Sequence, residues 1–214
     1  MIKLVFADNQ PIFQAGIRAV LSAVPDIEIV GEADNSIDVQ QLVGQLRPQI
    51  LLLDLNLAGP PMVEVIRGVR ASLPEIAILI LTAHVHDAYL ARMMEAGVAG
   101  LLNKNVPVER LVEAIRRAAQ GEILFDQKQL RRAEQWRQEA GEKWASLSKH
   151  QEQILGLLAQ GITKAEVANR LEISPRLVDY HIGKFLKKLK FKSLLDTVNW
   201  VHKYFPEKSG SITG

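Results

Sequence analysis

The chain of 214 residues contains no cysteine and no apolar run that approaches the roughly 20 residues of a membrane-spanning helix. The first absence excludes a disulfide scaffold, thiol catalysis and cysteine-ligated zinc. The second absence, with an N-terminus that enters a strand-like segment without a separate signal segment, predicts a soluble cytoplasmic protein. Apolar residues make up 48% and charged residues 23%, which is ordinary for a globular protein and argues against global disorder.

The two halves of the chain differ in charge, although the net charge is only +2. Residues 1–121 hold ten Lys/Arg and thirteen Asp/Glu, whereas residues 122–214 hold sixteen and eleven. An acidic half joined to a basic half is typical of a sensing module tethered to a nucleic-acid-binding module. The expected organisation is a domain at 1–121, a helical linker at 122–146, a second domain at 147–206 and a disordered tail at 207–214.

The first half alternates short apolar strands with amphipathic helices. The expected strands are Lys3–Ala7, Ile27–Glu32, Ile50–Asp54, Ala77–Thr82 and Gly100–Asn103, and the expected helices lie near 11–24, 36–46, 62–72, 87–96 and 107–120. Five such strand–helix units predict an α/β fold with a five-stranded, parallel, doubly wound sheet that helices cover on both faces.

Four polar residues stand at the carboxyl ends of strands in this predicted sheet: Asp8, Asp54, Thr82 and Lys104. In parallel sheets, functional groups gather outside the carboxyl ends of the strands. Two carboxylates can hold Mg²⁺, and the cation and an ammonium can neutralise a phosphoryl group that is transferred to a carboxylate. The hydroxyl can then donate to a phosphoryl oxygen. The alternative is that each residue is a solvated strand end.

The stretch 148–192 predicts three short helices, and each start carries a capping signal. These signals are Ser148 with Gln151, Thr163 with Glu166, and Ser174 before Pro175. Gly161 between the first two helices is typical of a left-handed helix end. Short connections between three capped helices predict a helix-turn-helix. A final helix from Ser193 to Tyr204 is expected to complete it as an all-α four-helix domain.

The third of these helices has two distinct sides. Its apolar side comprises Val178, Ile182, Phe185, Leu186 and Leu189, and its polar side Arg176, Tyr180, Gly183, Lys184 and Lys187. From His181 to Lys192 the chain carries five lysines, Lys188 among them, and no acid. Such a surface suits polyphosphate, so it predicts binding to double-stranded DNA. The alternative is a solvated lysine face on an ordinary amphipathic helix.

The linker holds two of the three tryptophans, Trp136 and Trp144. Residues Asp126 to Ala140 predict a helix, continuous or nearly so, with Trp136 on one side. Two tryptophans are costly to leave exposed to water. The linker is therefore either a solvated tether or a helix that docks one domain on the other, and the sequence does not decide between them.

Both halves resemble known families. Asp8 in Val-Phe-Ala-Asp-Asn, Asp54 in Leu-Leu-Leu-Asp-Leu, Thr82 in Ile-Leu-Thr-Ala, and Lys104 resemble the receiver domain of bacterial two-component response regulators. Leu147–Val201, with Gln160-Gly161-Ile162-Thr163 and Val178-Asp179-Tyr180-His181-Ile182, resembles the LuxR-type helix-turn-helix. Together they resemble the NarL/LuxR class of response regulator over nearly the whole chain.

The resemblance implies that Asp54 accepts a phosphoryl group from a histidine kinase, with Mg²⁺ against Asp8, Asp54 and the backbone carbonyl of Asn56. Thr82 and Lys104 would read out the phosphoryl group, which would alter dimerisation and DNA access. The implied DNA-binding residues are Thr163, Lys164, Arg176, Asp179, Tyr180, Gly183, Lys184, Lys187 and Lys188. Leu194, Leu195, Val198 and Val201 would form the contact of a homodimer on DNA, and RNA polymerase is a further candidate partner.

The chain departs from the family pattern at three positions. Asn9 stands where the family has a second acid, which removes a negative charge and weakens the Mg²⁺ site. Leu101 replaces a switch aromatic, and Ala58 replaces a proline. These departures support an alternative, a phosphorylation-independent receiver switched by a protein or small-molecule partner.

A third hypothesis is an enzyme that turns over a phosphorylated metabolite through an aspartyl phosphate. The residue two positions after Asp54 is Asn56, so the acid that would serve as general acid/base is missing. The sequence therefore predicts a transcriptional regulator and no enzyme.

Overall fold

The computed structural model describes residues 1–83, 86–205 and 208. It divides into two compact units, Met1–Arg131 and Arg132–Gly214. The expected limits of the two domains and of the linker remain predictions. The disordered tail expected at 207–214 lies, except for residue 208, outside the described residues.

The first unit is built on a parallel sheet with strand order β2-β1-β3-β4-β5. The strands are β1 (Ile2–Ala7), β2 (Ile27–Ala33), β3 (Ile50–Leu53), β4 (Ala77–Thr82) and β5 (Gly100–Asn103). The helices between and after them are α1 (Pro11–Ser22), α2 (Ser36–Leu46), α3 (Met62–Ser72), α4 (Asp87–Glu95) and α5 (Val108–Ala119). The predicted five-stranded, doubly wound α/β fold is confirmed.

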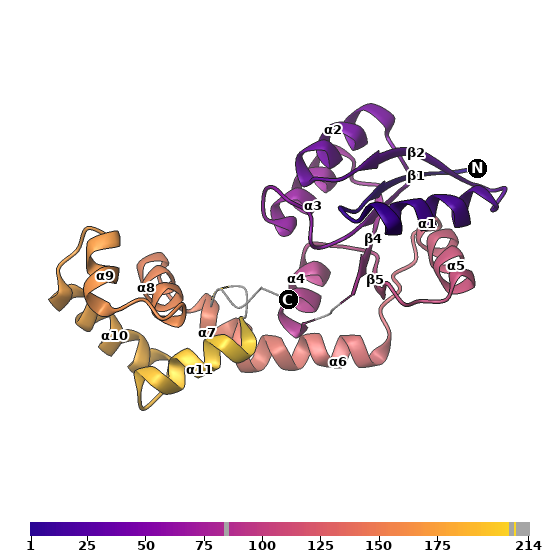
Figure 1. The fold of residues 1–214 in the computed structure, drawn as a ribbon. Helices are drawn as coiled ribbons and strands as arrows, with labels where there is room; N and C mark the ends of the chain where they lie inside the picture. Colours follow the sequence, from indigo (N-terminus) through magenta and orange to yellow (C-terminus); the bar gives the residue numbers. More distant parts are fainter. Residues whose placement is uncertain (84–85, 206–207, 209–214) are drawn as a thin grey trace. The chain divides into compact units, whose positions relative to one another are not determined.

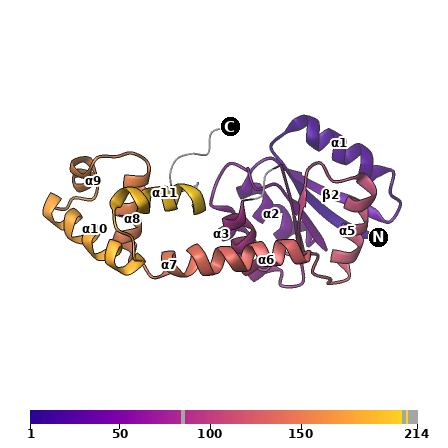
Figure 2. The same ribbon diagram turned by 90° about the horizontal axis from the view of Figure 1, so that it is seen from below.

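Helices cover both faces of this sheet, α1 and α5 on one side and α2, α3 and α4 on the other (Figures 1 and 2). Every residue of β3 is fully buried, as its unbroken apolar run predicts. One core lies between the sheet and the α1–α5 layer and includes Leu4, Phe6, Ile17, Leu52, Leu111 and Ile115. All five strands run in the same direction, so their carboxyl ends, and the polar residues that follow them, meet at one edge.

The second unit contains the linker from Arg132 onwards and four further helices. The linker forms α6 (Gln127–Trp136), a π-helical turn η1 (Arg137–Gly141) and α7 (Glu142–Ala145), so the helix expected to reach Ala140 changes pitch after Trp136. The four-helix module that follows comprises α8 (Lys149–Ala159), α9 (Lys164–Arg170), α10 (Pro175–Leu189) and α11 (Leu194–Tyr204). No helix in the described part of the chain is long and apolar enough to cross a membrane.

The predicted helix caps form. Ser148 with Gln151 and Thr163 with Glu166 make complete capping boxes, and the Ser174 side chain accepts from the backbone N–H of Leu177. At α11 the Ser193 side chain accepts from the backbone N–H of Asp196. Gly161 has φ +79°, the left-handed conformation expected of it.

An aromatic cluster joins the linker to the end of α11. The Phe205 ring centroid lies 4.4 Å from that of Trp144, 5.2 Å from Trp200 and 5.5 Å from Trp136. The Trp136 indole N–H donates to the backbone carbonyl of Tyr204 at 3.1 Å. The linker from Arg132 onwards therefore packs as part of the C-terminal unit, whereas residues 127–131 of α6 belong to the first unit. Trp136 and Trp144 are both buried, so the cost of exposing two indole rings to water is avoided.

Candidate functional site

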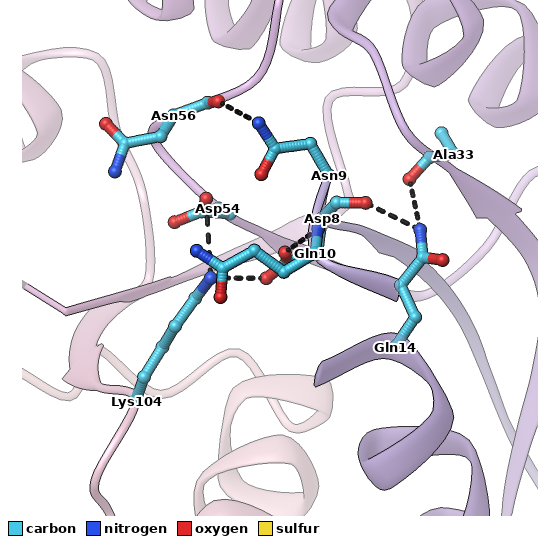
Figure 3. Close-up of polar contacts among 8 residues, drawn as sticks. All are labelled: Asp8, Asn9, Gln10, Gln14, Ala33, Asp54, Asn56 and Lys104. Carbon is cyan, nitrogen blue, oxygen red and sulfur yellow. Dashed lines mark hydrogen bonds and ion pairs between the residues drawn. The ribbon is translucent and has the colours of Figure 1, made fainter. Parts of the chain in front are cut away.

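The carboxyl edge of the sheet gathers two carboxylates and one ammonium (Figure 3). Asp8 follows β1, Asp54 follows β3 and Lys104 follows β5, and both aspartates are fully buried. Lys104 Nζ lies 2.6 Å from Asp8 Oδ2 and 3.4 Å from Asp54 Oδ2, so one ammonium bridges both acids. The same Nζ lies 4.6 Å from the centroid of the Phe13 ring, a cation–π contact.

Backbone hydrogen bonds hold these residues in place. The Asp54 N–H donates to the carbonyl of Ala7, and the Lys104 N–H donates to that of Thr82. Thr82 is buried at the end of β4, with 1% of its surface exposed. The structure therefore brings all four predicted residues, Asp8, Asp54, Thr82 and Lys104, to one edge.

Two glutamines that the sequence analysis did not single out position Asp8. The backbone N–H of Gln10 donates to Asp8 Oδ1 at 2.8 Å. The Gln14 side chain donates to the backbone carbonyls of Asp8 (2.5 Å) and Ala33 (3.3 Å) (Figure 3). In the sequence, the two glutamines differ from other surface residues only in lying just before and just after Pro11, where α1 begins. This position alone does not predict a contact with Asp8.

Burial raises the pKa of the Asp54 carboxyl above its ordinary value. The charge of Lys104 opposes this rise in pKa, and the nearby charge of Asp8 adds to it. Asp54 Oδ1 is buried and accepts no well-formed hydrogen bond from the residues that the structure describes. An ionised Asp54 is therefore incompletely compensated and suited to receive a cation or an electrophile.

The donor set at this edge fits Mg²⁺ in part. The Asp8 and Asp54 carboxylates and the Asn56 carbonyl are the hard oxygen groups that Mg²⁺ prefers. However, the Asn9 side-chain N–H donates to the Asn56 carbonyl oxygen at 2.9 Å. The neutral amide supplies less charge than an acid and engages one of the oxygens. In the part of the chain that the structure describes, no group of three or more His, Cys, Asp or Glu side chains could hold a metal ion, this edge included.

Leu101 stands where receiver domains have a switch aromatic, and its side chain is buried. Leu101 is 2% exposed in β5, and its backbone carbonyl accepts a hydrogen bond from the Gln129 side chain at 2.9 Å. An aliphatic side chain buried in this way lacks the polar tip and the large swing of an aromatic switch.

The second candidate surface is the outer side of α10. Val178, Ile182, Phe185 and Leu189 are buried beneath it, where α10 packs on α8 and α9. The opposite side is exposed and comprises Arg176, Asp179, Tyr180, Gly183, Lys184, Lys187 and Lys188. The predicted division of this helix into two sides is thus present. The predicted polar residues lie on one accessible surface, and Thr163 and Lys164, at the start of α9, are exposed beside it.

Several charges on this surface already have partners. Lys164 Nζ forms an ion pair with Asp179 Oδ1 at 2.7 Å, which joins α9 to α10. Lys188 donates to the backbone carbonyl of Ser146, and Lys184 Nζ lies 5.4 Å from the centroid of the Tyr180 ring.

The predicted dimer residues on α11 have different environments. Leu195 is 68% exposed, Leu194 and Val198 are half-buried, and Val201 is fully buried in its own unit. Leu195 is therefore the member of this set best placed to meet a second copy of the chain.

Comparison with protein families matches both units. Residues 4–116 match the response regulator receiver domain, and residues 145–201 match the bacterial regulatory proteins of the luxR family. The response regulator protein VraR of Staphylococcus aureus (strain Mu3) is 28% identical over 197 residues, which cover 92% of this chain and 94% of that protein.

Solved structures give the same fold. RcsB of Salmonella enterica serovar Typhimurium, solved bound to a promoter with a phosphomimetic, has a TM-score of 0.64 at 23% identity and covers 94% of this chain and 97% of its own. The receiver domain of a response regulator NarL from Mycobacterium tuberculosis has a TM-score of 0.54 at 28% identity and covers 56% and 98%. The chain therefore belongs to the response regulators that join a receiver domain to a LuxR-type DNA-binding domain and regulate transcription.

Proposed function

We propose that Asp54 is the phosphoacceptor of this response regulator and that its phosphorylation controls dimerisation and DNA binding. The observation that carries the proposal is the convergence of Asp8, Asp54 and Lys104 at one buried edge of the sheet, with Lys104 Nζ within 3.4 Å of both carboxylates. A histidine kinase is the proposed donor of the phosphoryl group, and the cytoplasm the proposed location.

In the proposed transfer, an oxygen of Asp54 forms the new P–O bond while the P–N bond of the donor phosphohistidine breaks. Lys104 is close enough to neutralise the arriving phosphoryl oxygens, and the Thr82 hydroxyl is the proposed donor to one of them. Asp8, Asp54 and the Asn56 carbonyl are the proposed Mg²⁺ ligands, with Asn9 as a weakening neighbour. Bound Mg²⁺ would supply electrostatic stabilisation of the transferred group.

The outer side of α10 is the proposed surface for double-stranded DNA, with Thr163 and Lys164 at the start of α9 beside it. Support comes from the exposed lysines of α10 and from the RcsB relative, which was solved bound to a promoter. A homodimer that meets through Leu195 of α11 would place two such surfaces on paired half-sites. RNA polymerase remains a candidate partner.

The family membership favours this function over a phosphorylation-independent receiver, because Asp54, Thr82 and Lys104 keep the positions that the chemistry needs. An enzyme that hydrolyses a metabolite phosphate finds no support, since Asn56 and its carbonyl stand where such an enzyme needs a second acid.

The phosphoacceptor is tested by incubating the protein with Mg²⁺ and a small phosphodonor such as acetyl phosphate. We expect a mass gain of one phosphoryl group that is base-labile, and we expect Asp54→Asn to abolish it. Asn9→Asp restores an acid at the cation site, so it should lower the Mg²⁺ concentration needed for labelling. The proposal is contradicted if the wild-type chain gains no mass, or if the Asp54→Asn variant is labelled as well as the wild type.

DNA binding is tested by replacing Lys184 and Lys187 with alanine. Each lost phosphate contact weakens binding to every duplex and reduces the slope of log affinity against log salt by about one. Lys149→Ala, an exposed lysine at the start of α8, is the matched control and should leave the slope unchanged. An unchanged slope for the double variant in a fluorescence-anisotropy titration would remove α10 from the DNA interface.

A further inference from the structure

The outer side of α10 carries an acid that a general phosphate-binding surface does not need. Resting on the DNA-binding function proposed above, we infer that Asp179 determines base specificity by accepting a hydrogen bond from a cytosine amino group. We further infer that Lys164 positions and neutralises this carboxylate. Both roles follow from the placement of three residues on the surface of the C-terminal unit.

Asp179 lies in the centre of the exposed stripe of α10. Arg176, Asp179, Gly183 and Lys187 are spaced by three and four residues, so they lie one above another on a single helix face. The Asp179 side chain is 61% exposed, and it is the only acid between Pro175 and Lys192. A lone carboxylate among cations on a surface that faces phosphate lowers affinity, which indicates a role other than attraction to the DNA backbone.

The carboxylate is held from outside its own helix. Lys164 Nζ lies 2.7 Å from Asp179 Oδ1, although the two residues are 15 positions apart and belong to α9 and α10. Both side chains are more than half exposed, and an exposed pair of this kind adds little to stability. The pair does fix the direction of Asp179 and offsets its repulsion of phosphate, while Oδ2 is left to accept another hydrogen bond.

Gly183 lies one turn after Asp179 on the same face. A glycine inside a helix weakens it relative to alanine, and a Cβ added at Gly183 would meet nothing within 4 Å. Packing within the unit therefore does not require this glycine. Its absent side chain instead lets the backbone of α10 come close to a partner, and close approach is what a short aspartate needs to reach a base edge.

The chemistry of a carboxylate selects the base. An ionised aspartate only accepts hydrogen bonds, and in the major groove the amino groups of cytosine and adenine are the base donors. Adenine presents its N7 acceptor beside its amino group, which repels a carboxylate, whereas cytosine presents the amino group without an acceptor of its own beside it. Cytosine is therefore the base that Asp179 should favour.

The test is selection of duplexes from a random library by the full-length protein, followed by sequencing. We expect one position of the selected site to favour cytosine by about fivefold to thirtyfold over the other bases. Asp179→Ala should abolish the preference at that position alone. Asp179→Asn should shift it to adenine, because an amide pairs with both N6 and N7 of adenine. Glu142→Gln removes an exposed acid of α7 and should leave the selected site unchanged.

The outcomes separate the two levels of the proposal. A wild-type protein that enriches no sequence and binds no duplex overturns the DNA-binding function itself. A wild-type protein that enriches a site, with Asp179→Ala and Asp179→Asn enriching the same site without change, overturns only the specificity role of Asp179.

The positioning role of Lys164 has its own readout. Lys164→Met removes the group that orients Asp179 and leaves the carboxylate uncompensated near phosphate, so affinity should fall for all duplexes and the cytosine preference should weaken. Adding Asp179→Ala to that variant removes the repulsion and should recover affinity. A double variant that binds no better than Lys164→Met would mean that Lys164 acts as a phosphate contact and not through Asp179.

Discussion

Asp54 shows at the scale of one residue how the fold prepares a group for chemistry at the expense of stability. Its carboxylate is fully buried, and Lys104 Nζ lies 3.4 Å from its Oδ2. Burial raises the pKa of Asp54, so the folded protein holds this proton more tightly than the unfolded chain does. The ionised side chain is therefore a local source of instability that a bound cation can relieve.

This imbalance predicts the effect of Asp54→Asn on stability. Because the folded pKa lies above the unfolded one, the free energy of unfolding falls as pH rises from the unfolded pKa through the folded pKa. Asp54→Asn has no carboxyl group to ionise at this position, so its free energy of unfolding does not fall in this way. It should match the wild type below about pH 4, the ordinary range of an aspartate, and exceed it near neutral pH. Urea unfolding across this range measures the difference.

The control for that measurement is Glu28→Gln, which removes an exposed acid of β2 and should show no comparable gain. Equal unfolding free energies for Asp54→Asn and the wild type near neutral pH would mean that Lys104 fully compensates the buried charge.

The linker shows at the scale of an element how one contact sets helix geometry. A Cβ added at Gly141 would lie 2.9 Å from Cζ3 of Trp136, which is closer than real Cβ atoms approach. The π-helical turn η1 lies between these two residues, and Trp136 is fixed by its contact with Phe205 and its hydrogen bond to Tyr204. The extra residue in this turn and the missing side chain together accommodate the indole.

Gly141→Ala should therefore destabilise the C-terminal unit by about 1–3 kcal/mol, the usual cost of overpacking. Gly156→Ala in α8 is the matched control, because a Cβ there meets nothing within 4 Å. That variant should gain about 0.5–1 kcal/mol from improved helix propensity. Chemical unfolding of both variants gives the comparison, and a stabilising Gly141→Ala would show that Trp136 moves aside freely.

The same element marks where sequence patterns stop being informative. Periodicity and caps located the strands, the helices and the carboxyl-edge residues, because these follow from local spacing and from the common direction of parallel strands. The Trp136 side chain that this turn accommodates contacts Phe205, 69 positions later, and no local pattern encodes that contact. The Gln14 contacts with Asp8 and the pairing of Lys164 with Asp179 depend likewise on tertiary packing.

At the scale of the whole molecule, the chain consists of two units with separate cores. Separate cores predict separate unfolding, so calorimetry of the full chain should resolve two transitions. Gly141→Ala should move only the transition of the C-terminal unit, by roughly 4–8 °C per kcal/mol for a unit of this size. Asp54→Asn should move only the other. A single transition that both substitutions displace would show that the units unfold cooperatively.

All three tryptophans of the chain belong to the aromatic cluster around Phe205, far along the sequence from Asp54. The N-terminal unit therefore contributes no tryptophan fluorescence, and a chemical change confined to that unit does not alter the tryptophan emission spectrum. A change in the intensity or wavelength of tryptophan emission after modification of Asp54 would therefore report a structural change in the C-terminal unit. Intrinsic fluorescence thus measures signal transmission between the units without an added label.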